Sequence, residues 1–148
     1  MEGNVGIKER LQRKAAQAGV PISGTFELTP RCNLSCRMCY IRMTPEEIKP
    51  YGRELTAQEW ISLGEQATQS GMRFLLLTGG EPMLRPDFSE IYSAMSYMGL
   101  SISINTNGTM LSEQVRDLLE RRPPSQLNVT LYGPREETYG TLCGNSHG

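Results

Sequence analysis

Short apolar segments alternate with longer amphipathic segments over most of the chain. Four of the short segments are rich in apolar and β-branched residues, which is typical of strands in a parallel sheet. These predicted strands are residues 25–29, 74–78, 101–105 and 127–131. Residues 74–78 are almost continuously apolar, as expected of a strand buried on both faces. The alternation of strands with helices predicts an α/β fold of about four parallel strands with flanking helices.

The first long amphipathic segment has clear start and end signals. Thr56 and Glu59 have the spacing of a capping box, in which each side chain accepts a hydrogen bond from a free backbone N–H. Gly71 ends the pattern. The helical periodicity predicts that four residues face the sheet, namely Trp60, Ile61, Leu63 and Ala67.

Two further helices are indicated by the same kind of signal. Asp87 with Glu90 repeats the capping pattern, and Ser112 is a candidate cap for the next helix. The helix after Asp87 is expected to bury Phe88, Ile91, Tyr92, Met95 and Met98. A fourth helix is expected near Glu136.

The ends of the pattern divide the chain into two parts. Residues 7–18 carry apolar residues at helical spacing, so residues 1–21 are expected to form an N-terminal helical extension. Residues 22–148 contain every strand signal and are expected to form the core domain. Within it, Pro45 and Pro50 of the long loop 30–55 disfavour a long helix.

Composition narrows the class of protein without identifying it. The 148 residues suffice for one domain, since a chain of about this size buries roughly 68–70% of its unfolded surface. The net charge of -1, without a run of five like charges, disfavours a nucleic-acid or membrane-surface partner. The first twenty residues contain no apolar run of signal-peptide length. A cytoplasmic protein with reduced thiols is therefore expected.

Cysteines are the most informative residues of this chain. Three of the four follow the first predicted strand with the spacing C-x-x-x-C-x-x-C, at Cys32, Cys36 and Cys39. Thiolates are the ligands of iron–sulfur clusters, and three of them leave one iron of a [4Fe-4S] cubane open. The spacing alone also suits a structural zinc site completed by Cys143 or His147, or a redox pair made by Cys36 and Cys39.

A second motif follows the second predicted strand and consists of Gly79, Gly80, Glu81 and Pro82. Together with the three-cysteine loop it resembles the radical SAM superfamily, whose signature loop follows the first strand of a TIM-like (βα) barrel. The resemblance implies that the three cysteines bind a [4Fe-4S] cluster. It also implies that residues 79–82 hold the amino group of S-adenosylmethionine (SAM), with glycines allowing close approach and the Glu81 carboxylate accepting hydrogen bonds from the ammonium.

The resemblance implies further contacts to the cofactor. Members often carry an aromatic residue just before the third cysteine, where it helps to bind adenine; Met38 occupies that position here, with Tyr40 just beyond. Two segments at predicted strand ends resemble those that line the SAM and substrate cavity, with Asn107 and Thr130 as the expected contacts. No cluster role is implied for Cys143.

The resemblance also implies an activity. In this superfamily one electron from the cluster cleaves SAM to methionine and a 5′-deoxyadenosyl radical, which abstracts hydrogen from a substrate. The surroundings of the motifs are most similar to the branch that modifies peptides and proteins. A peptide or protein substrate is therefore implied, together with an electron donor such as a flavodoxin or ferredoxin.

The core of the superfamily normally has six strands, whereas four are predicted here. The chain is therefore expected to be a partial barrel, truncated after the fourth strand, with an open parallel edge unless a partner completes it. The main interpretation is a radical SAM enzyme or a fragment of one. The alternatives are a non-catalytic truncated remnant and a small module that binds zinc or iron. The sequence thus predicts a cofactor site rather than complete catalysis by this chain.

Overall fold

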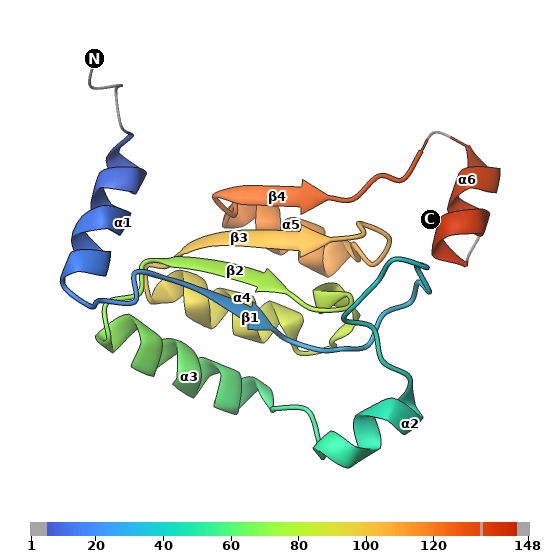
Figure 1. Ribbon diagram of the computed structural model, residues 1–148, viewed down its shortest axis with the longest axis horizontal. Coiled ribbons are helices and arrows are strands. Elements are labelled where there is room, and N and C mark those ends of the chain that lie inside the picture. The colour runs from blue at the N-terminus through green and yellow to red at the C-terminus, as the bar shows by residue number, and fades with distance from the viewer. Residues whose placement is uncertain (1–5, 134, 145–148) are drawn as a thin grey trace.

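Four parallel strands form one sheet at the centre of the molecule (Figure 1). The computed structural model describes residues 6–133 and 135–144. The strands lie side by side in chain order and are β1 (Ser23–Glu27), β2 (Phe74–Thr78), β3 (Ser101–Thr106) and β4 (Gln126–Val129). Every neighbouring pair is parallel, so all carboxyl ends lie at one edge of the sheet. The predicted α/β fold with four parallel strands is confirmed.

Helices connect the strands, and the three longest after the first strand pack on one face of the sheet (Figure 1). They are α3 (Ala57–Gln69), α4 (Phe88–Tyr97) and α5 (Glu113–Arg121). Helix α1 (Ile7–Gln17) lies at the amino end of the sheet, and α6 (Glu136–Cys143) lies near its carboxyl end. Three short helices lie in loops, namely α2 (Pro45–Ile48) and the 3₁₀ turns η1 (Lys49–Tyr51) and η2 (Pro82–Leu84).

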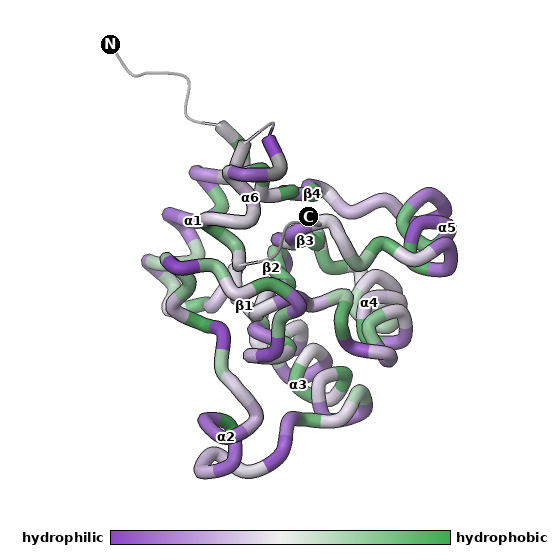
Figure 2. The backbone as a smooth tube through the Cα atoms, turned by 90° about the vertical axis from the view of Figure 1, so that its right-hand side faces the viewer, coloured by the Kyte–Doolittle hydropathy of each residue, from purple (hydrophilic) through white to green (hydrophobic). Residues whose placement is uncertain are grey.

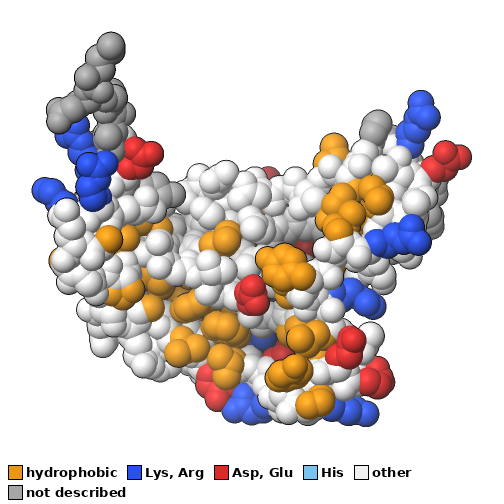
Figure 3. Space-filling view, in the orientation of Figure 1, with side chains coloured by type: hydrophobic (Ala, Val, Ile, Leu, Met, Phe, Trp, Pro, Cys, Tyr) orange, Lys and Arg blue, Asp and Glu red, His pale blue; other side chains and the backbone are white. Residues whose placement is uncertain are grey.

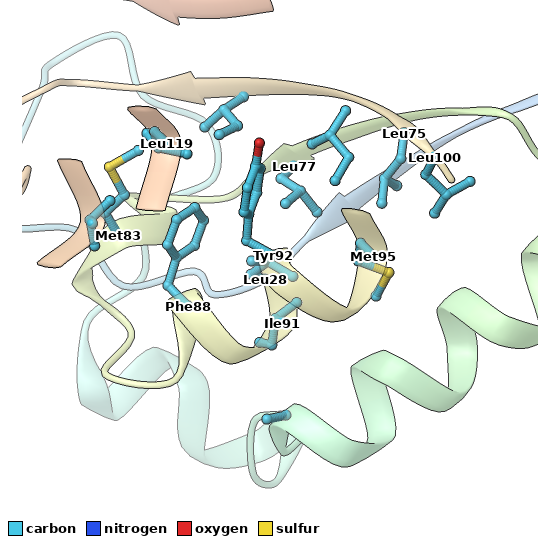
Figure 4. Close-up of a cluster of buried hydrophobic side chains, with 14 of the residues drawn as sticks. Leu28, Leu75, Leu77, Met83, Phe88, Ile91, Tyr92, Met95, Leu100 and Leu119 are labelled. Atoms are coloured by element: carbon cyan, nitrogen blue, oxygen red, sulfur yellow. The ribbon is translucent and has the colours of Figure 1, made fainter. Parts of the chain in front are cut away.

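The hydrophobic core lies between the sheet and these three helices. Alternate residues of the central strands point into it and are almost fully buried, namely Leu75, Leu77, Ile102 and Ile104. Helix α4 contributes Phe88, Ile91, Tyr92 and Met95, as predicted, and Figure 4 shows this cluster. Met98 is only partly buried. Each fully buried side chain of this kind contributes about 1.5–3 kcal/mol, so this layer fixes the strand ends that carry the site.

The opposite face of the sheet is not covered by a helix among the described residues. The side chains on this face alternate with those of the core, and most of them carry a hydroxyl or an amide group. A hollow of about 450 Å³ lies on this face, and its lining includes Thr25, Leu76, Ser103 and Gln126. Figure 3 shows a hollowed surface between α1 and α6. The prediction that β2 is buried on both faces is therefore wrong, because Phe74 and Leu76 on this side are only half-buried.

Two of the predicted helix caps are confirmed and one is wrong. In α3 the Thr56 hydroxyl accepts from the Glu59 N–H at 3.3 Å and the Glu59 carboxylate accepts from the Thr56 N–H at 2.8 Å. Ser112 caps α5 by accepting from the Val115 N–H at 3.3 Å. Asp87 makes no side-chain cap, because its carboxylate accepts two hydrogen bonds from Arg85 at 2.8 and 2.7 Å.

Helix α3 turns a slightly different face to the sheet from the one predicted. Trp60 and Ala67 pack against the core, Ile61 is half-buried and Leu63 is 38% exposed. The contact with α4 is made at Gly64, where a side chain would overlap the thioether of Met95. The glycine therefore sets the line of closest approach, and Leu63 lies outside it.

Helices α1 and α5 are mostly hydrophilic (Figure 2). In α1 the apolar side chains of Ile7 and Leu11 are largely exposed, 80% and 44% respectively. No helix among the described residues has both the length and the apolar composition needed to cross a membrane.

Candidate functional site

The cysteine loop begins at the carboxyl end of β1. Cys32 and Cys36 are half-buried and Cys39 is exposed. Two backbone hydrogen bonds attach the loop to the last turn of α6, from the Ser35 N–H to the Cys143 carbonyl at 2.8 Å and from the Arg37 N–H to the Leu142 carbonyl at 2.9 Å. Helix α6 therefore supports the loop from a position more than a hundred residues away in the sequence.

The glycine motif after β2 packs directly against the base of the cysteine loop. The Gly80 N–H donates to the Thr29 carbonyl at 2.7 Å, and the Glu81 N–H donates to the Arg31 carbonyl at 2.9 Å. Gly79 has a φ of 145°, a backbone conformation that residues with a side chain rarely adopt. At Gly80, a Cβ atom would overlap the Arg31 carbonyl. Glycine is thus required because two backbone segments touch here.

The Glu81 carboxylate lies inside the protein rather than in the cavity. The residue has no exposed surface. One oxygen accepts from the Met83 N–H at 3.0 Å, the other accepts from the Asn107 N–H at 2.8 Å, and the Thr106 hydroxyl donates to both. This differs from the expectation of a carboxylate open to an ammonium group, because neighbouring donors already surround it. Glu81 instead fixes the loop after β3 to the glycine motif.

A cavity of about 310 Å³ opens at this edge of the sheet. It brings together nine of the eleven predicted site residues, namely Cys32, Cys36, Met38, Cys39, Tyr40, Gly79, Gly80, Asn107 and Thr130. Glu81 and Pro82 are fully buried beside it and do not line it. Met38 and Tyr40 are 52% and 90% exposed, so their side chains lie at the open rim. Four separate loops thus meet at one concave surface.

Several N–H groups lie against the cysteine sulfurs. The backbone N–H of Leu34 is 3.4 Å from Cys32 Sγ, and the backbone N–H of Arg42 is 3.3 Å from Cys39 Sγ. The side-chain amide of Asn107 is 3.7 Å from Cys32 Sγ. Such donors stabilise negative charge on sulfur, whether on a free thiolate or on a metal-bound one.

Burial raises the pKa of the Cys32 thiol and, more strongly, the pKa of the Cys143 thiol. Burial likewise raises the pKa of the Tyr132 hydroxyl, with a contribution from its contact with Cys36. The free Cys32 thiol is therefore mainly protonated near neutral pH, and a metal that binds it must displace that proton.

The donor set is compatible with an iron–sulfur cluster. Among the described residues, no three histidine, cysteine, aspartate or glutamate side chains are grouped as the ligands of one ion. In a cubane each cysteine binds a different iron, so the three thiols need not converge on one point. Three thiols around a cavity that is also lined by the glycine turn are compatible with this arrangement.

Cys143 is fully buried, as the sequence interpretation expected of a lone cysteine, and it belongs to a cluster with Leu34 and Tyr139 against which Cys32, Cys36 and Tyr132 pack. His147, the other proposed zinc ligand, lies outside the described residues. Sequence reasoning missed the support that α6 gives to the loop. The sequence predicted a helix near Glu136 but carried no signal of where it packs.

Sequence reasoning also missed Arg85, whose side chain is 4% exposed. Its guanidinium donates to the Leu28 carbonyl at the end of β1, to the Leu55 carbonyl at the end of the long loop, and to Asp87. The first two hydrogen bonds measure 2.9 Å each. Arg85 therefore joins three segments beneath the site, and its position three residues after the glycine motif was the only available signal.

Comparison with known proteins gives the family of this chain. The family model for the radical SAM superfamily matches residues 26–148. The sporulation killing factor maturation protein SkfB of Bacillus subtilis (strain 168) is 30% identical over 129 residues, which is 87% of this chain and 30% of SkfB. The PqqA peptide cyclase of Gluconobacter oxydans (strain 621H) is 37% identical over 127 residues, which is 84% of this chain and 35% of the cyclase.

Solved structures share the fold. SuiB of Streptococcus suis, in a crystal structure bound to the precursor peptide SuiA, superposes with a TM-score of 0.72 at 18% identity. The superposition covers 93% of this chain and 31% of SuiB. The chain thus spans about a third of the length of these relatives. On the match of the family model and the fold, this chain belongs to the radical SAM superfamily.

Proposed function

We propose that this chain binds a [4Fe-4S] cluster through Cys32, Cys36 and Cys39 and binds SAM beside it. The observation that supports this function best is the shared cavity at the carboxyl ends of the strands, which collects the three thiols and the glycine turn. Parallel α/β enzymes place their chemistry at this edge of the sheet. The superfamily membership of the chain supports the same cofactors.

Each predicted site residue has a role in this proposal. The three thiolates would hold three irons, which would leave the fourth iron open to the amino and carboxylate groups of SAM. Backbone groups of Gly79 and Gly80 receive the SAM amino group, while the buried Glu81 and Pro82 keep that turn in place. Met38 and Tyr40 at the rim pack on adenine, since a thioether and an aromatic ring both make favourable contacts with a π-system. Asn107 and Thr130 also line the cavity.

When bound, the cluster supplies one electron that cleaves SAM to methionine and a 5′-deoxyadenosyl radical, which takes a hydrogen atom from the substrate. The residues of the chain orient SAM and restrict water at the reacting carbon. We further propose a peptide or protein substrate. The names of the PqqA peptide cyclase and of a maturation protein support this class, and SuiB shares the fold and is bound to a precursor peptide.

The proposal includes a cellular setting and an electron source. We place the protein in the cytoplasm, where reducing conditions keep thiols free for cluster assembly. A low-potential electron carrier such as a flavodoxin or ferredoxin would then supply the electron. An assay can replace this carrier with dithionite.

Anaerobic reconstitution of the 148-residue chain with iron and sulfide tests the proposal. We expect a brown, cluster-bearing protein that releases 5′-deoxyadenosine from SAM only when dithionite is present. The triple variant Cys32→Ala, Cys36→Ala, Cys39→Ala should lose both properties, whereas Cys143→Ala should keep the cluster. A chain that takes up one zinc ion through Cys143 and assembles no cluster would contradict the proposal and favour the zinc-module alternative.

A further inference from the structure

The side-chain amide of Asn107 reaches the first cysteine of the loop. Its Nδ2 lies 3.7 Å from Cys32 Sγ and 2.9 Å from the Asn33 Oδ1. Asn107 follows β3, whereas Cys32 and Asn33 follow β1, so this contact crosses the edge of the sheet. Among the described residues, it is the one N–H donor from a side chain that lies against a cysteine sulfur of the loop.

The orientation of this amide is fixed by its partners. The backbone N–H of Thr109 lies 2.9 Å from Asn107 Oδ1, and a backbone N–H can only donate. The oxygen must therefore face Thr109, which leaves the NH₂ group facing Cys32. The Thr109 hydroxyl donates to the same oxygen at 2.7 Å and accepts from Asn33 Nδ2 at 2.7 Å, so the three side chains form a closed ring.

The backbone of Asn107 is held as firmly as its side chain. Its N–H donates to Glu81 Oε2 at 2.8 Å, and Glu81 is completely buried. The preceding residue, Thr106, is 4% exposed and donates to the same carboxylate. Because both ends of Asn107 are anchored, its amide cannot turn away from Cys32 without breaking the ring.

A hydrogen bond to a cluster sulfur favours the more negative, reduced state of the cluster and so raises its reduction potential. Besides the backbone N–H groups of Leu34 and Arg42, which no side-chain substitution removes, the Tyr132 hydroxyl lies against Cys36. Asn107 is the side-chain N–H donor at Cys32 among the described residues, so a substitution at this position can change the potential.

We propose that Asn107 raises the midpoint potential of the cluster by donating its Nδ2–H to Cys32 Sγ, and so eases the reduction on which SAM cleavage depends. This inference rests on the proposed cluster at the three cysteines. Asn107 acts through Cys32 and is a positioning and tuning residue rather than a catalytic one. The anchor that orients it is the buried carboxylate of the glycine motif, which links the two motifs of the sequence.

An anaerobic redox titration followed by electron paramagnetic resonance tests this role on the reconstituted chain. Asn107→Leu removes the donor at similar volume, and Asn107→Asp keeps the acceptor toward Thr109 but replaces the donor with an oxygen. In Asn107→Leu we expect the ratio of reduced to oxidised cluster at a fixed potential to fall about tenfold, a shift of roughly 59 mV for one electron. Asn107→Asp should shift further in the same direction because it adds negative charge.

Asn128→Leu is the matched control. Asn128 lies on β4, donates to Asn105 at 2.8 Å and does not line the cavity of the cysteines. Its potential should equal that of the wild type. Equal potentials in the wild type and both Asn107 variants, at equal cluster content, would overturn the role of Asn107 alone. Failure of the wild-type chain to assemble a cluster would overturn the proposed function itself, so the two failures are distinguishable.

Discussion

Replacing Glu81 by glutamine tests the anchor beneath the site, because the change removes one acceptor oxygen at nearly constant shape. In the wild type each carboxylate oxygen accepts from a different backbone N–H, at 3.0 Å from Met83 and 2.8 Å from Asn107. Glutamine has a single oxygen, so one of these two buried N–H groups must face an NH₂ group.

The size of the effect follows from these contacts. A hydrogen bond to a charged group contributes about 1.5–3 kcal/mol, and leaving a buried donor unsatisfied costs about 1–3 kcal/mol. Burying a neutral amide costs less than burying a carboxylate, which offsets part of the loss. We therefore expect Glu81→Gln to lower the free energy of unfolding by about 3 kcal/mol, a large share of the ~5–15 kcal/mol typical of a domain.

Urea unfolding of the metal-free chain, followed by far-ultraviolet circular dichroism, measures this change. Glu90→Gln is the control, since Glu90 is exposed and its substitution should alter stability by less than about 0.5 kcal/mol. A stability of Glu81→Gln within 0.5 kcal/mol of the wild type, on the same scale as the scatter of exposed substitutions, would refute the inward-facing anchor.

Three further predictions concern the support of the site. Gly80→Ala should destabilise the chain by about 2 kcal/mol, because the added Cβ would overlap a backbone carbonyl. Gly140→Ala in α6 has open space around the added Cβ and should stabilise the chain by about 0.5–1 kcal/mol. Urea unfolding measures both changes. Arg85→Met should lower the free energy of unfolding by about 3 kcal/mol, because the buried acceptors of Arg85 lose their hydrogen-bond donor. Replacement of the exposed Arg53 by methionine should have a much smaller effect in the same assay. The hydrogen bonds from Arg85 hold the pKa of Asp87 below its usual value, so their stabilisation is present above about pH 4 and is lost as the pH falls through the folded-state pKa. Asp87→Asn should therefore lose less stability than the wild type between neutral and acidic pH.

Each of these predictions has a contradictory outcome. Equal stabilities of Gly80→Ala and Gly140→Ala would show that the two loops do not touch at the glycine motif. An Arg85→Met variant as stable as Arg53→Met would show that Arg85 does not hold the three segments beneath the site together. Identical acid dependence of Asp87→Asn and the wild type would show that the Arg85 contact does not depress the pKa of Asp87.

The repeating pattern of strands and helices was predictable because it depends on local periodicity and on a parallel sheet with one buried face. The bounds of β2 agree with the sequence prediction, and those of β1 and β4 differ by one or two residues. The sequence also allowed the prediction that the site residues lie close together, because parallel strands bring the loops at their carboxyl ends together. Nine of these residues line one cavity.

What the sequence did not predict depends on contacts between distant segments. The letters Asp87 and Glu90 match a capping box, but Arg85 competes for the Asp87 carboxylate, and a pattern cannot rank the two partners. Glu81 likewise has the same place in the motif whether its side chain points to the cavity or into the protein. The packing of α6 against the cysteine loop joins residues 35 and 143, beyond the reach of periodicity.

The proposed site is tested most directly by asking whether the three cysteines hold a cluster that leaves one iron open to SAM. Electron paramagnetic resonance of the reconstituted, dithionite-reduced chain, recorded with and without SAM, measures this. We predict the signal of a reduced [4Fe-4S] cluster that depends on Cys32, Cys36 and Cys39 and changes when SAM is added. A cluster signal that persists without these cysteines, or one that SAM leaves unchanged, would contradict a SAM-binding cluster at these cysteines.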